Sequence, residues 1–140
     1  MHEQGIPAGY SKRTLVEKLG IKSGFKVKFI AAPENYLETL GELPERVVLV
    51  EQSHAAIDFL QIFVKSCSDL ELRFPQLKKA LATNGMMWVS WPKKASKIET
   101  DLNENIVREI GLKNNLVDIK VCAVDEIWSG LKFVYRKKDR

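Results

Sequence analysis

The chain has 140 residues, a formal net charge of +4 and a hydrophobic fraction of 45%. This length suits one domain with its own core, and this hydrophobic content argues against a disordered chain. The mild positive charge permits contact with anions without requiring it. We see neither a signal-peptide pattern nor an apolar stretch long enough to cross a bilayer, so we expect a cytoplasmic protein that does not bind membranes.

Few residues are available for metal or redox chemistry, because the chain has only two cysteines and two histidines. Cys67 and Cys122 fall in separate predicted elements, without the spacing of a zinc site or a redox pair, so we expect buried free thiols. His2 and His54 have no Cys, Asp or Glu at ligand spacing. The sequence therefore predicts no metal site.

The first half of the chain predicts two helices and three strands. We expect a single α/β domain spanning 1–140. Its residues 1–9 should form a loose lead-in, because glycine and proline discourage regular structure there. Ser11 can cap a first helix that ends at Gly20, and Pro33 suits the first turn of a second, short helix. Apolar residues then predict strands over these segments: 25–31, 47–50 and 57–64.

The direction of the strand over 47–50 stays open. Six residues join it to the next strand, and parallel neighbours usually need a crossover of about a dozen. The strand is therefore either antiparallel or a short edge piece.

The second half begins with a helix and a central strand. Ser68 and Glu71 have the spacing of a capping box, and Pro75 should kink or split the helix that follows. Gly85 then ends that helix, and residues 86–89 form a continuous apolar run typical of a strand buried on both faces. Pro92 should stop the pairing of this strand.

The last part of the chain predicts one more helix and a hairpin. Asp101, with Glu104 three residues later, can cap a helix that continues irregularly to Leu116. Alternating residues over 117–124 indicate a half-exposed strand. The turn 125–130 is too short for a crossover, so the strand over 131–136 should return antiparallel.

This order of elements resembles the methyltransferase-like Rossmann scaffold. The segments IDFLQIFV and KKALATNGMMWVSWP are similar to passages of that family. The resemblance implies a three-layer α/β fold whose sheet is mostly parallel and ends in an antiparallel hairpin. More narrowly, the chain resembles a small bacterial family known only as a domain of unknown function, through GYSKRTLVEKLGI, PENY, VSWPKKASK, TDLNEN, VREIGL, VDIKVCAVDE and WSGLKFV.

The methyltransferase family binds S-adenosylmethionine through a glycine-rich turn after the first strand. Glycine lets the backbone approach the cofactor, and an acid at the end of the second strand holds the ribose. The corresponding turn here, 32–36, contains no glycine, although Glu51 could imitate the ribose acid. The resemblance therefore implies a scaffold without its cofactor turn, and we expect no cofactor, with S-adenosylmethionine disfavoured.

Candidate site residues come from four loops that should meet at the carboxyl ends of the parallel strands: 33–36, 65–67, 91–97 and 125–130. The basic loop could hold a phosphate or carboxylate just before a helix amino end, and two tryptophans could form an aromatic wall for a planar ligand. The ligand-binding candidates are Asn35, Tyr36, Trp91, Lys93, Lys94, Lys97 and Trp128.

Each candidate also has a plain structural alternative. Lysines in a loop are usually solvated, tryptophans usually pack in a core, and Asn35 and Tyr36 can cap and pack the short helix. Asp125 and Glu126 are adjacent carboxylates that could serve acid–base chemistry, but neighbours at a hairpin are usually solvated charges. We assign no catalytic residue.

Three functions follow from these residues. The first is a non-catalytic, small-molecule-binding or regulatory module on the methyltransferase-like scaffold. The second is an enzyme that acts on a small anionic substrate at the carboxyl-end edge of the sheet, with Lys93 and Lys94 binding the anion and Asp125 or Glu126 as acid–base. The third is weak nucleic-acid binding through 93–97, which no aromatic–basic motif supports.

Overall fold

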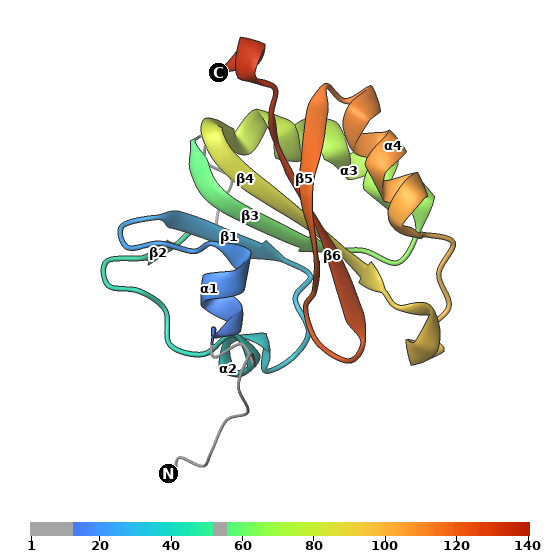
Figure 1. Cartoon of the computed structure of the whole chain (residues 1–140), viewed down its shortest axis with the longest axis horizontal. Coiled ribbons are helices and arrows are strands. Elements are labelled where there is room, and N and C mark those ends of the chain that lie inside the picture. Colours follow the sequence, from blue (N-terminus) through green and yellow to red (C-terminus); the bar gives the residue numbers. More distant parts are fainter. Residues whose placement is uncertain (1–12, 52–55) are drawn as a thin grey trace.

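The computed structural model describes residues 13–51 and 56–140 (Figure 1). The expected lead-in 1–9, the cap at Ser11 and both histidines lie outside the described residues. The described elements are α1 (Leu15–Leu19), β1 (Lys26–Ile30), α2 (Tyr36–Leu40), β2 (Val48–Leu49), β3 (Ile57–Phe63), α3 (Cys67–Ala80), β4 (Leu81–Pro92), the 3₁₀ turn η1 (Lys94–Ser96), α4 (Glu104–Lys113), β5 (Leu116–Ala123), β6 (Trp128–Tyr135) and η2 (Lys137–Asp139).

Six strands form one sheet in the order β2-β1-β3-β4-β6-β5. The first four run parallel, and β6 lies antiparallel between β4 and β5. The structure confirms the expected mostly parallel sheet with an antiparallel hairpin at its end. It also settles the direction of the strand expected over 47–50, because Val48 and Leu49 pair parallel with Lys26 and Val27. The strand β2 pairs only with the first two residues of β1, so it ends near the level at which β3 begins. A short link can therefore join β2 to β3.

Helices cover the sheet on both sides, which makes three layers (Figure 1). We call the two sides the α1/α2 face and the α3/α4 face. Side chains of β3 alternate between them, because successive residues of a strand point to opposite sides. Phe59 and Phe63 join the core under α1 and α2, and Leu60 and Ile62 join the core under α3 and α4.

The short helix α1 is held at both ends. Thr14 and Glu17 form a capping box, in which the Thr14 Oγ1 accepts from the Glu17 backbone N–H and the Glu17 carboxylate accepts from the Thr14 N–H. At the other end, the indole Nε1–H of Trp88 donates to the Leu19 carbonyl oxygen over 2.8 Å. Trp88 is fully buried, so this bond ties α1 to the middle of the sheet.

Two helix starts differ from the sequence expectation. Ser66, not Ser68, caps α3 and accepts from the Asp69 N–H. Asn103, not Asp101, caps α4 and accepts from the Ile106 N–H. Asp101 instead accepts from the Cys67 N–H over 2.7 Å, a tertiary contact to the first residue of α3 that sequence spacing does not reveal.

The expected break in α3 and the glycine stop after it are both wrong. Pro75 lies inside one continuous helix, at an exposed position. The helix ends at Ala80, and Gly85 lies within β4. A Cβ at Gly85 would lie 2.8 Å from the Ile57 carbonyl oxygen, where the pairing of β3 with β4 is irregular. Glycine is therefore needed there for close backbone approach.

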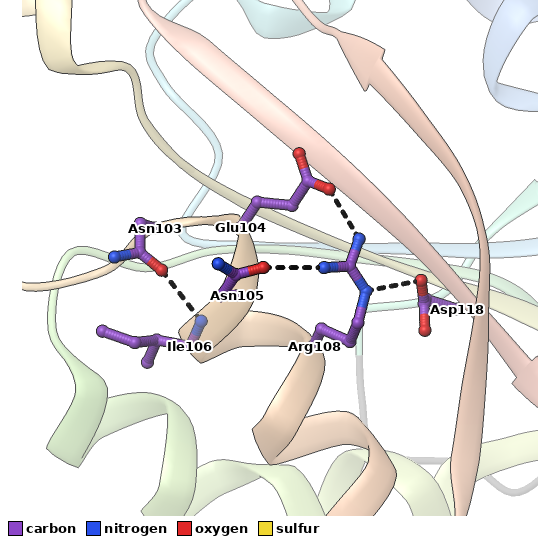
Figure 2. A network of polar contacts seen from close by, with 6 residues as sticks. All are labelled: Asn103, Glu104, Asn105, Ile106, Arg108 and Asp118. Carbon is purple, nitrogen blue, oxygen red and sulfur yellow. Dashed lines mark hydrogen bonds and ion pairs between the residues drawn. The ribbon is translucent and has the colours of Figure 1, made fainter.

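A polar network fastens α4 to the edge strand β5 (Figure 2). The Arg108 guanidinium donates to Glu104 and Asn105 on its own helix and to the Asp118 carboxylate over 2.8 Å.

The helix α4 ends at Lys113, so Leu116 is the first residue of β5 and not the end of the helix. The hairpin strand β6 likewise begins earlier than expected, at Trp128.

Within the described ranges no helix is long and apolar enough to cross a membrane. The cytoplasmic location stays a prediction.

Gly111→Ala should destabilise the protein by about 2 kcal/mol, because a Cβ at Gly111 would overlap the ring of the buried Phe133 where α4 packs on β6. Urea unfolding followed by circular dichroism measures the loss. Leu112→Ala is the control, since Leu112 is the next residue on the helix and is exposed. Equal stability of Gly111→Ala and the wild type would contradict the packing described here.

Candidate functional site

A cavity of about 770 Å³ lies between β1, β2 and the short helix α2, on the α1/α2 face. Glu51, two residues after the end of β2, is one of the residues that line it. Its volume lies within the range usual for small-molecule sites. The cavity is lined by Val27, Phe29, Ala32, Pro33, Asn35, Tyr36, Leu37, Glu38, Leu49, Val50 and Glu51.

The turn between β1 and α2 has a backbone that glycine usually provides. Ala31 and Asn35 have φ values of 58° and 66°, in the left-handed region. A non-glycine residue there costs roughly 1 kcal/mol, less for Asn, so the surrounding structure must hold this shape. Asn35 precedes α2 but makes no side-chain cap bond, so its amide lines the cavity instead of capping the helix.

A chain of buried polar side chains lies beneath the cavity. The Tyr36 hydroxyl donates to the Gln61 Oε1 over 2.8 Å, and the Gln61 Nε2 donates to the Ser90 Oγ over 3.0 Å. Gln61 and Ser90 are fully buried, on β3 and β4. Burial raises the pKa of the Tyr36 phenol well above its ordinary value. Tyr36 is therefore a neutral donor that fixes α2 to the sheet.

Aromatic rings separate this cavity from a second one. The Tyr36 ring packs edge-on against Phe29 and Phe63, and Phe63 packs edge-on against Trp128, with centroids 4.8–5.5 Å apart. The second cavity, of about 490 Å³, shares Pro33 with the first and opens between the carboxyl ends of β1 and β3. It is lined by Ala31, Pro33, Phe63, Val64, Lys65, Ser66, Asp69 and Trp128.

The basic loop lies apart from these two cavities. Trp91, Lys93 and Lys94 line a third cavity, of about 540 Å³, beside residues 100–104 at the start of α4. The structure thus brings the lysines to the helix start, as expected, but Asp101 and Glu104 carboxylates line the same space. Lys97 is exposed after η1. Anion binding by these lysines stays a prediction.

The expected aromatic wall of Trp91 and Trp128 is wrong. Trp128 pairs with Pro92 and Trp91 pairs with Ser129, so the two indoles point to opposite sides of the sheet. Trp91 belongs to the core on the α3/α4 face, and Trp128 belongs to the core on the α1/α2 face. One planar ligand cannot lie between them.

The paired acids of the hairpin turn also differ in role. The Asp125 Oδ1 accepts from the backbone N–H groups of Ile127 and Trp128, each over 2.8 Å, so this carboxylate shapes the turn. Glu126 is exposed. An acid–base role for either residue stays a prediction.

Comparison with solved structures identifies the scaffold. A SAM-dependent methyltransferase (SAM, S-adenosylmethionine) from Aquifex aeolicus matches with a TM-score of 0.56 and 16% identity, over 85% of this chain and 86% of that chain. The magnesium protoporphyrin IX methyltransferase of Synechocystis PCC 6803 with bound SAM matches with a TM-score of 0.57 and 11% identity, over 87% and 74%. The chain has a methyltransferase-like Rossmann fold. At these identities the likeness shows the fold alone.

A third similar structure is fibrillarin of Aeropyrum pernix with natively bound SAM, with a TM-score of 0.51 and 11% identity, over 83% of this chain and 69% of that chain. No family model matches the sequence, and no curated protein matches it. Membership of a small family of unknown function therefore stays a prediction, whereas the methyltransferase-like scaffold is confirmed.

These neighbours contradict the expectation of no cofactor, with S-adenosylmethionine disfavoured, because structures with this fold carry bound SAM. The expectation rested on the lack of glycine in the turn after the first strand. In the structure, Ala31 and Asn35 adopt the left-handed conformations that glycine would supply. The turn therefore contains left-handed backbone conformations without containing glycine.

Sequence reasoning missed Gln61 and Ser90. The signal was present, because Gln61 lies between Leu60 and Ile62 in a strand expected to be buried, and a buried polar side chain needs hydrogen-bond partners. Its partners come from α2 and β4, so only the tertiary structure identifies them.

Tyr36→Phe should change the pH dependence of stability. Unfolded tyrosine ionises near pH 10, whereas folded Tyr36 keeps its proton to higher pH, so above pH 10 the unfolded chain binds fewer protons and the free energy of unfolding falls. The variant should lose about 1 kcal/mol at pH 8, where Gln61 lacks its donor, and should decline less steeply above pH 10.

Urea unfolding at about pH 8, 10 and 11 measures both effects. Tyr135→Phe is the comparison variant, because Tyr135 is only partly buried and donates to the Lys78 carbonyl far from the cavity. Parallel pH profiles of the wild type and Tyr36→Phe would refute the role given to burial.

Proposed function

We propose that the chain binds S-adenosylmethionine or its demethylated product in the cavity between β1, β2 and α2. The observation that carries this proposal is the position of Glu51, an acidic residue that lies just beyond the second strand and lines a cavity beside the turn that follows the first strand. In dinucleotide-binding sheets an acid near this place accepts from ribose hydroxyls. The solved neighbours with bound SAM support the choice of ligand.

The residues present fit such a ligand. Glu51 offers acceptor oxygens for the two ribose hydroxyls, and the apolar side chains of Leu37, Leu49 and Val50 offer a surface for an adenine ring. The Ala31–Ala32 backbone carries only methyl side chains, so it allows close approach. When bound, S-adenosylmethionine supplies an electrophilic methyl group on a sulfonium.

The role that we propose for this site is ligand binding by a small-molecule-binding or regulatory module. Its support is the buried Tyr36–Gln61–Ser90 chain, which holds the cavity wall with neutral hydrogen bonds and leaves Tyr36 protonated. Such a chain stabilises and orients a wall, and it does not supply a base.

Isothermal titration of the full chain with S-adenosylmethionine and S-adenosylhomocysteine tests the proposal. We expect binding of both, and a loss of affinity of about tenfold in Glu51→Gln, because a hydrogen bond to a charged acceptor contributes on the order of 1.5 kcal/mol or more.

Glu42→Gln is the matched control, since Glu42 is exposed in the loop before β2 and outside the cavity. It should bind like the wild type. Absence of binding by the wild type, or equal affinities of Glu51→Gln and Glu42→Gln, would overturn the proposal.

A further inference from the structure

Among the described residues, helices cover strand β1 on only one of its faces. Val27 and Phe29 point under α1 and α2, whereas Lys28 and Ile30 point to the α3/α4 face. Parallel strands are usually covered on both faces. Seven residues separate β2 from β3, whereas a crossover that contains a helix needs about twelve. The nearest helix on this face, α3, lies toward β3 and β4 (Figure 1).

The uncovered side of β1 forms a groove with an apolar floor. A cavity of about 460 Å³ lies between β1 and α3, and Leu60 and Leu77 are buried at its base. Leu72 stands at its side with 78% of its surface exposed, the largest exposure among the described large apolar side chains. We call this surface the β1 groove; it is lined by Lys28, Ile30, Leu60, Leu72, Arg73, Gln76, Leu77 and Ala80.

Another exposed apolar side chain lies at the edge of the sheet, on the same face as the β1 groove. Val48 pairs with Lys26 in register and therefore shares its face, and 54% of Val48 is exposed. Contiguous exposed apolar surface with a polar border is typical of an interaction site. Leu72 and Val48 are both exposed apolar side chains on the α3/α4 face.

The border of the β1 groove is positively charged. Among the described residues, the side chains of Lys26 and Lys28 form no ion pair, and Arg73 pairs with Asp69 on its own helix. The Asp58 carboxylate of β3 accepts from the Lys26 backbone N–H. An acidic binding partner could therefore form ion pairs with Lys26 and Lys28. A second copy of this chain would instead bring the same cations and the same net charge of +4, and the two copies would repel each other.

We propose that the β1 groove binds an acidic amphipathic helix of a partner protein. A helix fills the layer that α3 and α4 occupy over the rest of this face, and its apolar residues at i, i+3, i+4 and i+7 enter beside Leu72 and Ile30. Acidic residues flanking that stripe meet Lys26 and Lys28. The β1 groove lies on the opposite side of β1 from the proposed adenosyl cavity, so this proposal stands without the other.

Fluorescence anisotropy of a labelled peptide of about 18 residues, five helical turns, tests this proposal on the full chain. The peptide carries leucine at the spacing above and glutamate elsewhere, and a scrambled peptide of the same composition is its control. We expect binding of the patterned peptide, and a loss of about tenfold or more in Leu72→Glu and in Lys28→Glu, as for truncated interface anchors.

Lys79→Glu is the matched control variant, because Lys79 is an exposed cation on the same helix that does not line the β1 groove. It should bind the patterned peptide within about twofold of the wild type, since an exposed charge at a distance contributes little. Thermal unfolding of each variant checks that Leu72→Glu, at an exposed position, leaves the fold intact.

Three results would overturn the proposal: no binding of the patterned peptide, equal binding of the scrambled peptide, or an equal loss in Lys79→Glu. Sedimentation of the protein alone adds a fourth, because a dimer that Leu72→Glu dissociates would make a second copy the occupant. A monomer that binds the patterned peptide only through the β1 groove supports the inference.

Discussion

The parallel pairing of β3 with β4 is the constraint on which the rest of the structure depends. Both strands lie in the middle of the sheet, and their buried side chains enter the cores on both faces. Burial on two faces leaves no room for unpaired polar groups, so Gln61 accepts from the Tyr36 hydroxyl and donates to Ser90. The position of α2, and with it the shape of the cavity between β1, β2 and α2, follows from that requirement.

The sequence was sufficient for the architecture because its strongest signals are local. Largely apolar segments marked the buried strands over 57–64 and 86–91, and a short link marked the terminal hairpin. The errors concern residues whose partners are distant in the chain. Gly85 looks like a residue that ends a helix, but it lies in a strand, where the Ile57 carbonyl oxygen leaves no space for a side chain. Asp101 has the spacing of a helix cap, but its carboxylate accepts from the first backbone N–H of α3.

The candidate site was less predictable than the fold for the same reason. A list of loops at one end of a sheet does not tell on which face of the sheet each side chain lies. Trp91 and Trp128 are offset by one residue in the register of their strands, and this offset places their side chains on opposite faces. The turn after β1 shows a second limit. Composition suggested that it lacked the backbone of a cofactor turn, whereas conformation is set by surrounding contacts, which hold Ala31 and Asn35 in a region that their side chains disfavour.

All three tryptophans of the chain are buried, which has a spectroscopic consequence. Trp88 and Trp128 belong to one core and Trp91 to the other, and the Trp88 indole is bonded to the end of α1. Intrinsic fluorescence therefore samples both layers at once. Loosening of α1 alone would expose the Trp88 nitrogen to water while Trp91 stayed dry, so a partial red shift of the emission would distinguish detachment of α1 from melting of the whole sheet.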